Sequence, residues 1–305
     1  MVQKIAKPFP ITIQKDGSNK KYQVEFLIEG SVRGNENLVF GASEVDNLGK
    51  KAVIKVLRRF NNNDERDELL KGNSLIEGIQ NQNLARVDYS GLVLSEGKEI
   101  PLILMENIDG KTLLNETDNR ISDEYRGEMA FGELHYRKSE ISKIGPASII
   151  DDTIKIIQEI AHALDKLHER GIMHRDIKPD NIILDKMKNR AVLIDFDFCT
   201  KKSRFQQTGV LRFRSPENNK FRYEFASDIY SLGVLTISLL APRRFYLSTP
   251  RTKSFYETDG YKEAAYNLEK YVGYMLPYSF REIIQACIEM NPKNRPKTSE
   301  FKWIC

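Results

Sequence analysis

A short segment beginning at His174 combines an acid, a cation and a carboxamide at close spacing. Asp176 lies two positions before Lys178 and five before Asn181, in a turn-rich stretch between apolar runs. This spacing can place a proton acceptor, a phosphate-facing charge and a metal ligand around one point. Asp195 follows Asn181 by fourteen residues, directly after an apolar strand, and offers a further oxygen ligand. These residues predict transfer of a phosphoryl group from a metal-bound nucleotide.

The composition is that of an ordinary globular protein. The 305 residues are 40% hydrophobic and 30% charged, enough for one large domain or two lobes. Lys plus Arg (47) barely exceed Asp plus Glu (43), an excess too small to argue for a nucleic-acid or membrane partner, and we expect neither. The longest apolar stretch, residues 232–241, is too short to cross a bilayer. The three cysteines show no CxxC spacing. We therefore expect a cytoplasmic protein with free thiols.

The order of the elements indicates two parts. Short alternating runs between residues 11 and 56, separated by Gly, Asn and Asp, are typical of an antiparallel meander. A charged helix is then expected over 64–79 and an apolar strand over 100–105. Apolar periodicity predicts later helices over 151–170, 227–240 and 283–289.

We therefore predict an α+β fold with two lobes. The N-lobe, residues 1–107, is expected to be a small antiparallel β-rich lobe with one main helix and an N-terminal extension, 1–21. The C-lobe, residues 108–305, is expected to be larger and mostly helical. The polar stretch 114–148 is predicted to be an insert in this lobe.

The chain resembles the eukaryotic-type protein kinases over nearly its whole length. The motifs that carry the resemblance, in order, are Val53-Ile54-Lys55, Met105-Glu106, His174–Asn181, Asp195-Phe196-Asp197, Ser215-Pro216-Glu217, Ser227–Gly233 and Asn294-Arg295-Pro296. Each motif alone is weak, but an HRDxKxxN segment with these successors is specific. The resemblance implies a two-lobed kinase fold, a catalytic loop (174–181) and an activation segment (195–217). The lysine of DxKxxN favours a serine/threonine kinase that acts on a protein substrate.

The resemblance also implies a role for each residue of the site. Asp176 would accept the proton of the attacking hydroxyl, and Lys178 would offset the charge of the transferring phosphate. Asn181 and Asp195 would ligate Mg²⁺, or Mn²⁺, through oxygen atoms. Lys55 would contact the α- and β-phosphates of ATP. The further residues expected to bind the nucleotide are Gly34, Asn37, Val39, Glu106, Ile108 and Glu68.

The glycine-rich loop of the family is poorly matched. If Val39 begins the family's V-Y-x-A sequence, only Gly34 falls on a glycine place, whereas a different register would use Gly30 and Gly34. Glycine allows the backbone to approach phosphates closely. Asn37 tolerates a positive φ angle better than most residues and is expected to serve in part.

Two more positions depart from the family pattern. The glutamate that pairs with Lys55 in the family falls near Gly72, so we expect Glu68, one turn earlier, as the partner, with Glu65 as the alternative. Asp197 replaces the glycine of the DFG motif, which would restrict the backbone and add a carboxylate near the metals. These departures keep open a pseudokinase scaffold as the alternative function, and a small-molecule kinase as a third.

Several residues are expected to support or regulate the site. A phosphate on Thr200, Ser203 or Thr208 would pair with Arg175 and order the activation segment, whether by autophosphorylation or through an upstream kinase or regulatory partner. By resemblance, Asp228 would hold the backbone of the catalytic loop. The resemblance also implies a buried ion pair between Glu217 and Arg295.

Overall fold

The computed structural model divides the chain into two compact units. It describes residues 2–15, 17–28, 37–47, 49–58, 60–95, 97–114, 146–201, 213–217, 224–240, 261, 265–266, 268–269 and 275–303. Unit 1 comprises Met1–Asp109 and Asp195–Cys199, and unit 2 comprises Gly110–Ile194 and Thr200–Cys305. The start of the activation segment, predicted to belong to the second part, thus clusters with the first.

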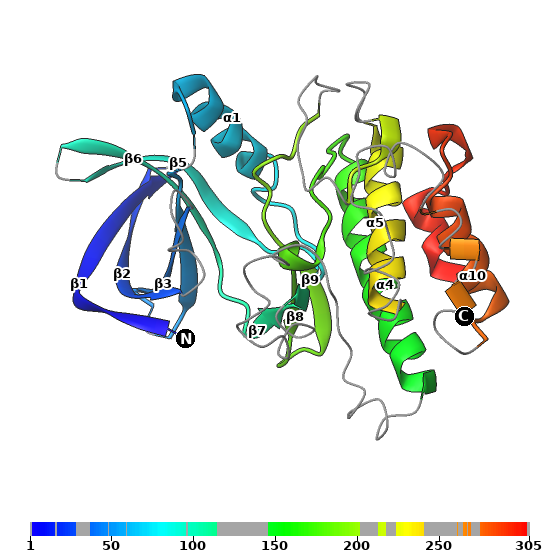
Figure 1. Ribbon diagram of the computed structural model, residues 1–305. Helices are drawn as coiled ribbons and strands as arrows, with labels where there is room; N and C mark the ends of the chain where they lie inside the picture. The colour runs from blue at the N-terminus through cyan, green and yellow to red at the C-terminus, as the bar shows by residue number, and fades with distance from the viewer. Residues whose placement is uncertain are drawn as a thin grey trace, which may run out of the picture. The chain divides into compact units, whose positions relative to one another are not determined.

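Unit 1 is built on a six-stranded antiparallel sheet of order β1-β2-β3-β4-β6-β5 (Figure 1). Its strands are β1 (Val2–Lys15), β2 (Ser18–Ile28), β3 (Leu38–Glu44), β4 (Lys51–Val56), β5 (Val87–Ser95) and β6 (Lys98–Glu106). Gly17 and Gly97 adopt φ angles of +73° and +76° in two of the hairpin turns, a conformation that glycine adopts without strain. The predicted antiparallel meander is confirmed.

Strand β1 begins at Val2, well before Ile11, where the alternating strand pattern of the sequence begins. It pairs with β2 from Val2 onward, with a register shift between Lys4 and Phe9. Prolines in this stretch weaken the sequence signal for a strand, but an edge strand tolerates them because its outer N–H groups need no partner. Alternate residues of the sheet form one core, which includes Ile13, Tyr22, Val24, Ile54 and Leu104.

Helix α1 (Asn63–Ser74) is the main helix of unit 1. The side chain of Asn62 caps it by accepting the N–H of Glu65 at 2.9 Å. The helix ends earlier than the predicted residue 79, and Gly78 lies in the turn that follows with a φ of +76°.

Unit 2 is mostly helical, as predicted. It contains the helices α4 (Pro146–His168), α5 (Phe225–Leu240) and α10 (Tyr278–Cys287), the strands β7 (Gly110–Thr112), β8 (Ile182–Asp185) and β9 (Arg190–Leu193), and the 3₁₀ helices η2 (Pro179–Asn181), η5 (Pro292–Asn294) and η6 (Thr298–Trp303). Helix α5 lies between α4 and α10 (Figure 1) and is buried from Ser227 to Leu240. A Cβ atom on Gly233 would lie 2.5 Å from the Cβ of Cys287, so glycine permits the close approach of α5 and α10.

Some predictions fall partly or wholly outside the described residues. These are the middle of the predicted insert (residues 115–145), Cys305 and most of the activation segment. Cys199 and Cys287 are buried free thiols. Within the described ranges, every helix is too short or too polar to cross a membrane.

Candidate active site

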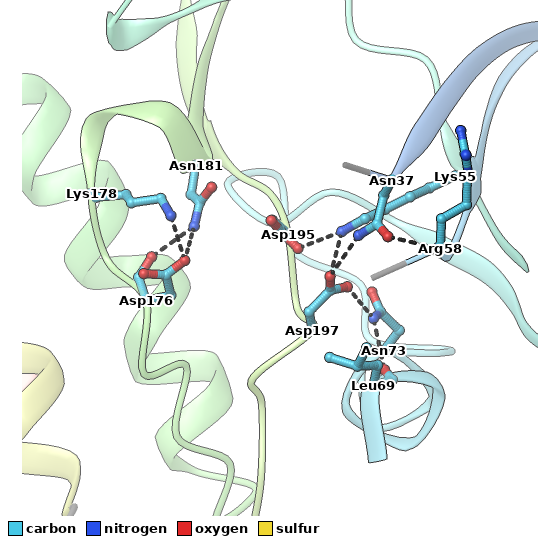
Figure 2. A network of polar contacts seen from close by, with 10 residues as sticks. All are labelled: Asn37, Lys55, Arg58, Leu69, Asn73, Asp176, Lys178, Asn181, Asp195 and Asp197. Atoms are coloured by element: carbon cyan, nitrogen blue, oxygen red, sulfur yellow. Dashed lines mark hydrogen bonds and ion pairs between the residues drawn. The ribbon is translucent and has the colours of Figure 1, made fainter. Parts of the chain in front are cut away.

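The acid, cation and carboxamide of the catalytic loop meet in one hydrogen-bonded turn (Figure 2). The Lys178 ammonium donates to Oδ2 of Asp176 at 2.7 Å. The amide Nδ2 of Asn181 donates to the same oxygen at 2.9 Å and to the Asp176 carbonyl at 2.8 Å. Pro179 begins the 3₁₀ helix η2 within this turn, where its fixed φ suits a first helical position. Two donors therefore hold the same carboxylate oxygen of Asp176, and this residue is 5% exposed.

The buried side chain of Asp228, on helix α5, stabilises this turn through hydrogen bonds to its backbone. Its two oxygens accept the backbone N–H groups of His174 at 2.9 Å and Arg175 at 2.8 Å, and Nε2 of His168 lies 2.9 Å from Oδ2. Arg175 has a φ of +72°, a left-handed conformation that costs about 1–3 kcal/mol for a residue other than glycine. Burial would raise the pKa of Asp228, but the hydrogen bond from His168, the charges of His168 and His174 and the N–H of Arg175 together outweigh burial and lower it. Asp228 thus stabilises the loop conformation, as the resemblance implied.

Lys55 of strand β4 forms two ion pairs within unit 1 (Figure 2). Its ammonium lies 2.7 Å from Oδ1 of Asp195 and 2.7 Å from Oδ2 of Asp197. Burial would lower the pKa of this ammonium, but the two carboxylates outweigh burial and raise it. Lys55 is therefore a buried, fully charged group.

The structure corrects the expected pairing of Lys55 with a helix glutamate. Among the described residues, carboxylates of Asp195 and Asp197 contact the ammonium, and neither Glu68 nor Glu65 does. Glu68 is half-buried on α1, while the Glu65 carboxylate accepts the backbone N–H of Asn61 at 2.7 Å. Sequence reasoning missed this role of Asp197. The signal that could have indicated it was the aspartate that stands in place of the glycine of the DFG motif.

Asp197 is held on both of its oxygens. Oδ1 accepts Nδ2 of Asn73 at 2.9 Å, and this nitrogen also donates to the carbonyl of Leu69 at 3.0 Å. Nδ2 of Asn37 lies 3.5 Å from Oδ2, the oxygen that Lys55 occupies. Burial and the neighbouring Asp195 raise the pKa of Asp197 to about 6.

The other residues predicted to bind the nucleotide lie around strands β3 and β6. Asn37 precedes β3, and its Oδ1 accepts the backbone N–H of Arg58 at 2.9 Å. Val39 is paired with Lys55 across β3 and β4. Glu106 ends β6, and Ile108 is half-buried just beyond. Gly34 and the alternative Gly30 lie outside the described residues, so these roles stay predictions.

The expected metal ligands fit a hard cation. Asn181 uses its amide nitrogen on Asp176, so Oδ1 is the atom it can offer to a metal. The side chain of Asp195 is 33% exposed, and the residue has a left-handed φ of +65°. The N–H of Ile194, the residue before it, donates to the carbonyl of Asn181 at 2.8 Å. In the described ranges, no three His, Cys, Asp or Glu residues cluster as metal ligands. Asn181 belongs to unit 2 and Asp195 to unit 1, and each offers an oxygen atom of the kind that Mg²⁺ prefers.

A bidentate ion pair holds the end of the activation segment. Nη1 and Nη2 of Arg295 lie 2.6 and 2.8 Å from the two oxygens of Glu217. Burial would raise the pKa of Glu217, but the hydrogen bond and charge of Arg295, with the hydrogen bonds from the Glu217 N–H and Ser227, together outweigh burial and lower it. Thr200 pairs with Met173 through two backbone hydrogen bonds of 2.9 and 3.1 Å, while Ser203 and Thr208 lie outside the described residues.

Comparison with known proteins agrees with this geometry. Serine/threonine-protein kinase CLA4 of Eremothecium gossypii is 26% identical over 266 residues, 84% of this chain and 30% of that protein. Serine/threonine-protein kinase shk1/pak1 of Schizosaccharomyces pombe is 24% identical over 238 residues (75% and 34%), and serine/threonine-protein kinase PAK 1 of Mus musculus 32% over 154 (48% and 27%). The chain therefore spans 34% or less of these relatives. The family model described as protein kinase domain matches residues 33–303, and with most of its length so matched the chain belongs to the protein kinase family.

Proposed function

We propose that this protein is an ATP-dependent serine/threonine protein kinase. The observation that carries the proposal is the turn in which Asp176 accepts hydrogen bonds from both Lys178 and Asn181. A lysine at this place is the feature by which the chain resembles serine/threonine kinases. The three relatives compared above bear that name.

The geometry supports a different role for Asp176 and for Lys178 within the catalytic loop. Asp176 accepts the proton of a serine or threonine hydroxyl, and two donors orient its carboxylate before the substrate arrives. Lys178 carries a positive charge 2.7 Å from that carboxylate, where it can stabilise the charge that develops on the transferred phosphoryl group. The substrate is therefore a protein hydroxyl held beside Asp176.

ATP and a divalent metal ion follow from membership of the family. We assign Mg²⁺, with Mn²⁺ as a substitute, because Asn181 and Asp195 offer hard oxygen atoms. When bound, the metal would neutralise phosphate charge. Lys55 would bind the α- and β-phosphates through its buried ammonium. We further propose a cytoplasmic location, and an upstream kinase or regulatory partner that acts on the hydroxyls of the activation segment.

The test is phosphate transfer from γ-labelled ATP to a generic basic protein, followed by identification of the labelled amino acid. Asp176→Asn should lower the rate about 100- to 10,000-fold, the usual contribution of a general base. Asp180→Asn, the same change on an exposed residue of the same turn, should leave the rate unchanged. Nucleotide binding without transfer would instead indicate a pseudokinase, label on metabolites alone a small-molecule kinase, and label on tyrosine a different protein kinase class.

A further inference from the structure

The buried ammonium of Lys55 depends on two carboxylates that differ in their surroundings. Lys55 is 8% exposed, and a buried cation is stable only when it is paired. Asp195 and Asp197 lie at the same distance from it, 2.7 Å. The side chain of Asp195 is 33% exposed, whereas that of Asp197 is 9% exposed. The more exposed carboxylate of Asp195 is therefore accessible to a metal ion, whereas Asp197 is the buried partner of Lys55.

Asp197 is fixed by helix α1 and not only by Lys55. Its Oδ1 is bound by Asn73, which is fully buried and also donates to the Leu69 carbonyl of the same helix. Gly72 lets the helix lie directly against this segment, because a Cβ atom there would be 2.6 Å from the carbonyl oxygen of Phe196 and 2.8 Å from that of Asp197. Helix α1, strand β4 and residues 195–199 are thus joined at one carboxylate (Figure 2).

We propose that Asp197 is the positioning residue that holds Lys55 in place for the nucleotide, with Asn73 as its anchor on helix α1. The inference rests on the proposed function and assigns to Asp197 the role expected of a glutamate on that helix. The two carboxylates then have different roles. Asp197 keeps the ammonium of Lys55 in place, and Asp195 is available to bind the metal. Without Asp197, Lys55 and the metal would compete for the one carboxylate of Asp195.

The test compares Asp197→Asn with wild type in kcat/KM for ATP, in the Mg²⁺ concentration needed for half-maximal rate, and in ATP affinity measured by calorimetry. The matched control is Glu44→Gln, which removes the charge of a buried carboxylate of the same sheet that pairs with Lys50 at 3.1 Å and with Lys20 at 3.5 Å. We expect Asp197→Asn to lower kcat/KM about 10- to 100-fold and to raise the Mg²⁺ requirement about tenfold, since a charged hydrogen bond is lost. Glu44→Gln should change each quantity less than about twofold, the scale of a remote site.

The outcomes separate this inference from the proposed function. If wild type transfers phosphate and Asp197→Asn matches it in kcat/KM and Mg²⁺ requirement, the positioning role is refuted; equal losses in Glu44→Gln refute it too. If wild type binds ATP without transfer, the proposed function fails, and ATP affinity decides the inference: weaker binding by Asp197→Asn supports it, and equal binding overturns it. A wild-type chain that binds no ATP overturns both.

A second variant covers the case in which Asp197→Asn does not fold. Asn73→Ala keeps the charge of Asp197 and removes its anchor on helix α1. We expect the same direction of change in kcat/KM and Mg²⁺ requirement, at about 3- to 10-fold, because a hydrogen bond to a charged group is lost while the ion pair remains. Kinetic constants equal to those of wild type would contradict the anchoring role.

Discussion

Replacing Asp228 with Asn tests whether one buried carboxylate maintains the catalytic loop. The carboxylate accepts the N–H groups of His174 and Arg175 on separate oxygens and also contacts His168. Asparagine has only one side-chain oxygen, so one buried N–H group would face an NH₂ group. An unsatisfied buried group costs about 1–3 kcal/mol, and loss of charge from the remaining hydrogen bonds adds about 1. We expect the free energy of unfolding to fall by about 2–4 kcal/mol.

The kinetic effect should exceed what the loss of stability explains. The left-handed backbone of Arg175 directly precedes Asp176, so its relaxation would move the proposed general base. A displacement of about 1 Å can lower a rate about 100-fold, and we expect a reduction in kcat of that order. Urea unfolding measures the stability, and hydrogen exchange at the amides of His174 and Arg175 measures the local release.

Asp185→Asn is the matched control for this prediction. Asp185 is buried and accepts the backbone N–H groups of Met187 at 3.1 Å and Lys188 at 3.2 Å and Nε of Arg190 at 3.0 Å. This variant should lose comparable stability without faster exchange in the catalytic loop or a lower kcat. Unchanged exchange at His174 and Arg175 in Asp228→Asn, or equal loss of kcat in the control, would refute the reasoning.

Two further predictions concern packing in unit 2. Replacing Glu217 with Gln should lower the free energy of unfolding at pH 7 by about 3–5 kcal/mol, because the buried Arg295 loses its counter-charge. The pKa of Glu217 is lowered in the folded protein, so the stabilisation by its carboxylate is complete above the ordinary pKa of 4.5 and is lost as the pH falls through the lowered pKa. The difference in free energy of unfolding between wild type and Glu217→Gln should therefore narrow in acid, and a constant difference would contradict the prediction. Gly233→Ala should destabilise by about 1–3 kcal/mol in thermal unfolding despite better helix propensity, because its Cβ atom would lie 2.5 Å from that of Cys287; equal stability would show that α5 and α10 can separate freely.

The parts of the site that are local in sequence could be predicted, and the parts that depend on packing could not. Asp176, Lys178 and Asn181 lie within six residues, so one turn determines their contacts. The partner of Lys55 depends instead on which segment packs against helix α1. Spacing along the chain predicted Glu68, whereas the missing side chain of Gly72 brings the backbone of residues 196–197 against the helix.

The substitution of aspartate for glycine at position 197 carries no backbone strain in this conformation. Among the described residues other than glycine, only Arg175, Asn189 and Asp195 have a positive φ, so Asp197 does not use the freedom that glycine would provide. That freedom would matter only if the segment left its present conformation, and its contacts with Lys55 and Asn73 oppose such a departure. Aspartate at this position is therefore compatible with a competent site: the side chain that restricts the backbone is the one that holds Lys55.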